Sequence, residues 1–164
     1  MAISNAQATK INKMNRSAQD VSMGTLIQTM QTDIETIEGI GLTELSETVL
    51  YSQFTDGGAA VGTFVTSMAI PAGATVLYSA VKAVTGFTGD TSAVIQIGDG
   101  ADPDRYNTGT PSVFTSAANG IAVGAPSGVV YHAAGKTVNL TVTSATDWGA
   151  VAAGSVTVSV YYLS

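Results

Sequence analysis

Three aspartates fall within six residues of one another, in the segment Ile97–Tyr106, which reads IGDGADPDRY. Asp99, Asp102 and Asp104 could offer carboxylate oxygens from one compact loop, and oxygen ligands are what hard cations such as calcium bind. Their spacing differs from that of an EF-hand, whose acids stand at loop positions 1, 3 and 5 with Gly at 6 and Glu at 12. An EF-hand is therefore excluded, and a generic calcium loop remains one interpretation.

The second interpretation of the same segment is a turn at the end of a strand. Asp and Gly are typical of such turns, because Asp side chains accept hydrogen bonds from nearby backbone N–H groups. Arg105 follows Asp104 directly and can pair with Asp99 or Asp102 across the turn. The sequence favours this structural turn over the calcium loop, and it predicts no other cofactor.

The other residue types that commonly carry catalysis are scarce. Paired acids also serve glycoside hydrolysis, but Tyr106 is the one aromatic residue close to the aspartates in the sequence. The chain has no cysteine and a single histidine, His132, which falls in an expected strand and is interpreted as a surface or interface residue. It has no G-x-S-x-G elbow and no phosphate-binding G-x-x-x-x-G-K-[ST] motif. An enzyme is therefore not predicted.

The elements that would position these residues are mostly strands. From about residue 48 the apolar pattern has a period of two, as in Val156, Val158, Val160 and Tyr162. Seven or eight short strands bounded by turn residues, with no helical pattern among them, favour an antiparallel β-sandwich of jelly-roll-like type. The expected strands are 48–55, 62–70, 75–85, 92–98, 112–115, 128–133, 137–143 and 155–163.

The N-terminal part of the chain has a different character. Residues 1–16 are expected to form an arm whose basic residues, Lys10, Lys13 and Arg16, precede the first acid, Asp20. A helix is expected next, because a set of apolar residues recurs at spacings of four and three, on one helical face. That set is Met23, Ile27, Met30, Ile34 and Ile37. The sequence thus predicts an arm and helix over 1–45 and a β-sandwich domain over 46–164.

Charge and composition indicate what the chain contacts. Charged residues make up only 11% of the chain and the net charge is −6, whereas an average soluble protein has roughly 25% charged residues. Sheet faces this poor in charge favour association with other chains, and the helical stripe has two interpretations, covering the chain's own sandwich or meeting copies of itself. The negative charge argues against nucleic-acid binding by the sandwich domain. No signal peptide and no membrane span are expected.

Residues 69–106 read AIPAGATVLYSAVKAVTGFTGDTSAVIQIGDGADPDRY. This stretch resembles small β-rich virion proteins encoded among the head genes of tailed phages. The turn Pro71–Ala74 and the run Asp104, Arg105, Tyr106 carry the resemblance. It implies a capsid decoration, cement or head-fibre protein at the capsid surface of a virion. Such proteins are commonly trimers bound to the shell, so the implied partners are the major capsid protein and further copies of the chain.

Two functions from different classes follow. The first is a non-enzymatic virion structural protein, with Lys10, Lys13, Arg16 and the apolar helical stripe as partner-binding residues. The alternative is a carbohydrate- or receptor-binding β-sandwich module of a fibre, which needs exposed aromatic side chains on which a glycan can stack.

Overall fold

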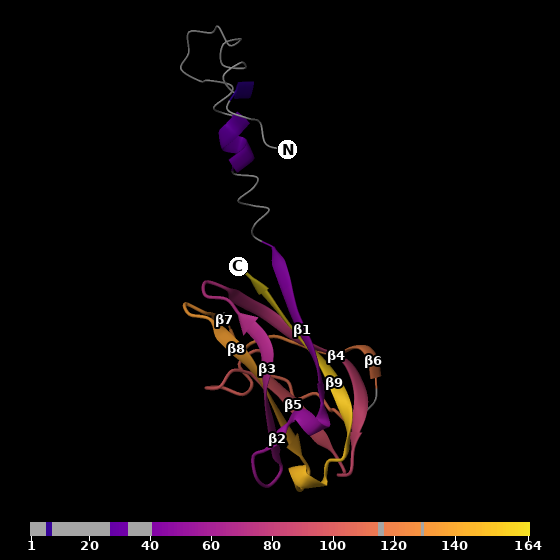
Figure 1. Cartoon of the computed structure of the whole chain (residues 1–164). Coiled ribbons are helices and arrows are strands. Elements are labelled where there is room, and N and C mark those ends of the chain that lie inside the picture. Colours follow the sequence, from indigo (N-terminus) through magenta and orange to yellow (C-terminus); the bar gives the residue numbers. More distant parts are fainter. Residues whose placement is uncertain (1–5, 8–26, 33–40, 115–116, 129) are drawn as a thin grey trace. The chain divides into compact units, whose positions relative to one another are not determined.

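The computed structural model describes residues 6–7, 27–32, 41–114, 117–128 and 130–164 (Figure 1). The chain divides into two compact units, Met1–Gly41 and Leu42–Ser164. In the first unit, residues 6–7 and 27–32 are helical, and Ile27 and Met30 of the expected apolar stripe lie in the second of these segments. Met30 is 54% exposed. Lys10, Lys13, Arg16, Met23, Ile34 and Ile37 lie outside the described residues.

The second unit is a sandwich of two antiparallel sheets, which confirms the predicted fold class. One sheet has the order β1-β9-β4-β6 with β7 added beside β4, and the other has the order β2-β3-β8-β5. Two short 3-10 helices, η1 (Tyr51–Gln53) and η2 (Trp148–Ala150), lie in connections. The strands are β1 Leu42–Leu50, β2 Thr55–Asp56, β3 Val61–Ile70, β4 Thr75–Thr88, β5 Ala93–Gly98, β6 Ala117–Gly124, β7 Val130–Tyr131, β8 Lys136–Ser144 and β9 Ala153–Leu163.

Strand pairing follows a simple rule along the chain. The first half of the domain pairs in reverse order with the second half: β1 with β9, β3 with β8 and β4 with β6. An isolated antiparallel bridge between Val94 and Ser112 continues this order at β5. Successive pairs alternate between the two sheets, so the chain wraps around a common core.

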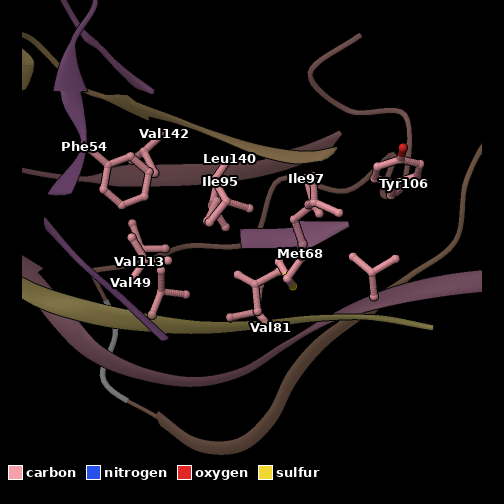
Figure 2. Packing of buried hydrophobic residues seen from close by; sticks show 14 of the residues in the cluster. Val49, Phe54, Met68, Val81, Ile95, Ile97, Tyr106, Val113, Leu140 and Val142 are labelled. Atoms are coloured by element: carbon pink, nitrogen blue, oxygen red, sulfur yellow. The ribbon is translucent and has the colours of Figure 1, made fainter. Parts of the chain in front are cut away.

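The core lies between the sheets and consists of the inward residues of the period-two pattern. Figure 2 shows Ile95, Ile97, Leu140 and Val142 of β5 and β8 facing Val49 and Val81 of β1 and β4. Trp148 packs against Phe54 and Phe87, with ring centroids 5.3 and 6.3 Å away. The period-two pattern of a strand such as β8 therefore works as predicted, because each apolar side chain on its inner face is removed from water.

The start of β1 and the whole of β6 were not predicted from the sequence. The strand pattern starts at Leu42 rather than near residue 48, because β1 alternates exposed Leu42, Glu44 and Ser46 with only partly buried neighbours. The second missed element is β6, whose sequence AANGIAVG has small residues without alternation. Both are edge strands in the order β1-β9-β4-β6, where burial on one side weakens the sequence signal.

Candidate functional site

The aspartate loop, residues 98–106, closes tightly at the end of β5. Tyr106 N donates to the Ile97 carbonyl at 3.0 Å, and Asp99 N donates to the Asp102 carbonyl at 2.9 Å. Gly98 is required here, because a Cβ at this position would lie 2.1 Å from the Asp102 carbonyl oxygen. The loop is thus a compact turn built directly on the last inward residue of the strand.

Asp99 holds the loop together from within, and its side chain is only 2% exposed. One carboxylate oxygen, Oδ1, accepts hydrogen bonds from Ala101 N and Asp102 N, both at 2.9 Å. The other, Oδ2, lies 2.9 Å from Arg105 Nε and 4.0 Å from Lys136 Nζ. The Arg105 contact is an ion pair, since the Nε–H direction departs from that of a hydrogen bond.

These contacts determine how Asp99 titrates. Burial by itself raises the pKa of the carboxyl group, but the two backbone N–H donors and the charge of Arg105 outweigh burial and lower it. Asp99 is therefore a carboxylate whose two oxygens already have partners within the protein. The pairing of Arg105 with Asp99 was anticipated from the sequence, and Arg105 Nη2 also lies 3.7 Å from Asp102 Oδ2.

Asp102 and Asp104 lie on the open side of the loop. The pKa of Asp104 is raised by its hydrogen bond with the Asp102 side chain, by burial and by the charge of Asp102. In the part of the chain that the structure describes, no group of three or more His, Cys, Asp or Glu side chains is arranged to hold a metal ion. Asp99 already has partners for both of its carboxylate oxygens, and the calcium loop at Asp99, Asp102 and Asp104 stays a prediction.

Tyr106 and His132 form a second polar contact, directly beneath the aspartate loop. The Tyr106 side chain is fully buried, and its hydroxyl lies 3.0 Å from His132 Nε2. Burial lowers the pKa of His132 and raises that of Tyr106, so both are neutral at pH 7. His132, interpreted from the sequence as a surface or interface residue, is buried in this chain: its ring packs edge-on against Tyr106, and its carbonyl accepts a hydrogen bond from Gly73 N at 2.7 Å.

The residues that lie beside the aspartate loop but come from elsewhere in the chain were not identified from the sequence. Tyr131 of β7, His132 just after it and Lys136 at the start of β8 follow the aspartate loop by about thirty residues, and no local pattern marks them as its neighbours. Two hollows flank Arg105 there, with volumes of about 300 and 230 Å³. The cluster therefore combines a buried interior, in which Asp99, Tyr106 and His132 have polar partners, with an open polar surface.

The fold and this cluster define a β-sandwich protein whose buried polar groups stabilise the turns. Among the described residues, no helix has the length and apolar character needed to cross a membrane.

No protein-family model matches the chain, and no curated protein matches it. Solved phage capsid structures do match. A chain of the capsid asymmetric unit of cyanophage Pam1 aligns with a TM-score of 0.54 and 21% identity, over 76% of this chain and 86% of that one. A chain of the acid-stable capsid structure of Helicobacter pylori bacteriophage KHP30 aligns with a TM-score of 0.45 and 15% identity, over 76% and 94%. At 21% identity the Pam1 likeness describes a shared fold.

Proposed function

We propose that the chain is a non-enzymatic structural protein of a phage virion, which decorates or cements the capsid through protein–protein contacts. The fold shared with a chain of the Pam1 capsid supports this proposal. Further support comes from the turn Pro71–Ala74 and the run Asp104–Tyr106, which resemble small phage head proteins and are joined in space through His132.

The outer face of the sheet β2-β3-β8-β5 is the observation that carries the proposal. None of the outward residues of these four strands is charged, and most are Thr or Val. Cores of protein interfaces are depleted in charged residues, whereas a free surface of this size normally carries several. The outward residues are Thr55, Val61, Thr63, Val65, Ser67, Ala69, Val94, Gln96, Thr137, Asn139, Thr141 and Thr143.

The strand order supports a jelly-roll topology for the sandwich. In a jelly roll, an antiparallel ribbon folds over so that its successive pairs alternate between two sheets. The pairs β1–β9, β3–β8 and β4–β6 and the Val94–Ser112 bridge follow that sequence. Viral capsid domains are among the proteins that use this architecture.

The N-terminal unit is proposed to attach the sandwich to the major capsid protein and to further copies of the chain, with a trimer as the favoured assembly. Its basic residues Lys10, Lys13 and Arg16 contrast with the acidic sandwich, and Met30 presents apolar surface to solvent. An attachment of this kind uses apolar burial and charge attraction at the capsid surface. It requires no membrane and no specific nucleic acid.

Deleting residues 1–40 tests the attachment role. The truncated chain retains every strand of the sandwich, so its melting is expected to match that of the full chain, and its circular dichroism should lose only the helical contribution of the deleted residues. In co-sedimentation with phage shells that lack this protein, the full chain should pellet with the shells and the truncated chain should remain in solution. Equal pelleting of the two would remove the N-terminal unit from the mechanism.

The uncharged sheet face is tested separately by Thr141→Glu, with Ser155→Glu on the other sheet as a matched control. Both positions face outward on strands and leave the core untouched. We expect the first substitution to weaken shell binding or self-association and the second to leave both unchanged.

A further inference from the structure

Two adjoining hollows form one groove beside the aspartate loop, and virion assembly as proposed above makes no use of it. The larger, of about 300 Å³, is lined by Asp102, Asp104, Arg105, Thr108, Ser127, Gly128 and Val130. The smaller, of about 230 Å³, is lined by Asp99, Arg105, Val130, Tyr131, His132 and Lys136. Arg105 and Val130 line both hollows, so the two adjoin one another. Together they fall within the range of small-ligand sites, roughly 300–1,000 Å³.

An aromatic side chain forms one wall of the groove. Tyr131 lies on the short strand β7 and is 61% exposed, which is the second-highest exposure among the described large hydrophobic side chains. The ring of a tyrosine offers a flat apolar face together with a polar hydroxyl. Val130 adds a second apolar surface beside it, so a ligand with one apolar face would be sheltered from water here.

The exposed charged groups at the two ends of the groove differ in sign, while Arg105 lines both hollows and the buried carboxylate of Asp99 lines the smaller one. The Asp102 and Asp104 carboxyl groups stand at one end with the hydroxyls of Thr108 and Ser127. At the other end stands Lys136, whose Nζ is 4.0 Å from Asp99 Oδ2 and whose side chain is 45% exposed. Lys136 is therefore only loosely paired and can accept a further anionic partner.

The floor of the groove is rigid. Arg105 is held by Asp99, and His132 is held through its ring by Tyr106 and through its backbone by the turn Pro71–Ala74. Recognition groups that are fixed in advance lose little freedom when a ligand binds. The same buried contacts that stabilise the turn thus keep the lining residues in place.

We propose that this groove binds a pyranose saccharide that carries a carboxylate. The C–H face of a sugar ring would pack on Tyr131, and its hydroxyl groups would hydrogen-bond to the Asp102 and Asp104 carboxyls, which accept strongly. The sugar carboxylate would pair with Lys136 and the exposed part of Arg105. A neutral sugar would make the first two sets of contacts and lack the third.

The test uses the full-length protein and three probes: glucuronic acid, N-acetylneuraminic acid and glucose. Saturation-transfer NMR is expected to show transfer from the protein to both acidic sugars, and titration is expected to show weaker binding of glucose. Tyr131→Ala should weaken binding of all three by about tenfold, since it removes the stacking surface. Lys136→Gln should reduce the preference for the acidic sugars, with Arg105 as the remaining cationic partner, and leave glucose binding unchanged.

Val65→Ala is the matched control, because Val65 is similarly exposed, at 63%, but lies on the opposite sheet. It should bind all probes as the unsubstituted protein does, and unchanged melting of each variant would show that the fold is intact. The proposal is overturned if no probe shows transfer at millimolar concentration. It is equally overturned if Tyr131→Ala binds as tightly as Val65→Ala does.

Discussion

The Tyr106 hydroxyl lies 3.0 Å from His132 Nε2 in the interior of the sandwich. Through His132, this contact links the aspartate loop to the turn Pro71–Ala74, which lies about thirty residues earlier in the sequence. Tyr106 ends the aspartate loop, whereas the backbone of His132 pairs with Gly73 and Ala74 of the turn Pro71–Ala74. Ser79 of β4 adds a third link, since its hydroxyl donates to the Tyr106 carbonyl at 3.0 Å. One end of the domain is therefore fixed by polar contacts that are shielded from water.

The domain is expected to become less stable as the pH falls, because His132 is buried. Burial lowers the pKa of His132 in the folded state, so below its ordinary value of about 6.5 the unfolded chain binds a proton that the folded chain does not. The free energy of unfolding therefore decreases as the pH falls from about 6.5 toward the folded-state pKa. Urea unfolding at pH 7.5 and 5.5 measures this, and the difference should shrink in His132→Gln. An identical pH dependence in both proteins would contradict the assignment.

Replacing Asp99 with Asn is expected to destabilise the domain by about 1–3 kcal/mol, because a buried carboxylate with charged and backbone partners loses its charge. Asp99 has a lowered pKa, so its contribution is present above about pH 3.8 and is lost as the pH falls through the folded-state pKa. Asp104→Asn is the matched control. It should be neutral or slightly stabilising, since an Asn side-chain amide can still donate to the Asp102 carboxylate, the contact that mainly raises the pKa of Asp104, and carries no charge to repel it. Denaturant titration at pH 7 compares the two, and equal losses would argue against a central role for Asp99.

The substitution Gly62→Ala, which adds a methyl group, is expected to lower the free energy of unfolding by about 1–3 kcal/mol, as overpacking of a filled core usually does. The added Cβ would lie 2.3 Å from Cε2 of Trp148, whose ring is held between Phe54 and Phe87. Gly100→Ala is the control, since the nearest atom to its Cβ would be Asn139 Nδ2 at 3.5 Å. Thermal melting with tryptophan fluorescence should show a lower midpoint for Gly62→Ala alone.

Glu47 links β1 of one sheet to β3 of the other. Its Oε2 accepts hydrogen bonds from both the backbone N–H and the hydroxyl of Ser67 on β3, each at 2.7 Å. We expect Glu47→Ala to cost about 1–2 kcal/mol. Glu44→Ala should cost less, about 0–1 kcal/mol, because its ion pair with Lys82 is exposed, and because the Ser159 hydroxyl that donates to Glu44 also lies 2.9 Å from Ser46 Oγ. Chemical denaturation of the two variants would show which one loses more stability. A larger loss of stability for Glu44→Ala than for Glu47→Ala would contradict this prediction.

The solution mass of the full chain tests self-association and the metal hypothesis together. Light scattering is expected to give a trimer, with the same mass after addition of EDTA, because Asp99 already has partners for both of its oxygens. A monomer would contradict self-association in the absence of the shell. Dissociation by EDTA would instead show that the aspartate loop holds a metal at a subunit joint.

Much of the fold could be predicted from the sequence, because burial between two sheets imposes a period of two on central strands such as β8 and β9. The turn at the aspartates was also predictable, since Asp, Gly and Pro have local reasons to stand there. Edge strands were harder: β6 is Ala- and Gly-rich and alternates too weakly to be recognised. Contacts such as Tyr106–His132 and Glu47–Ser67 depend on how distant strands meet, and no local pattern encodes that meeting.

The central claim, that the chain is a structural component of a virion, is tested most directly by quantitative mass spectrometry of purified phage particles from the phage that encodes it. The account predicts that the chain is recovered from washed particles in a fixed ratio to the major capsid protein. Its absence from particles, or recovery only in trace amounts that vary between preparations, would contradict the account.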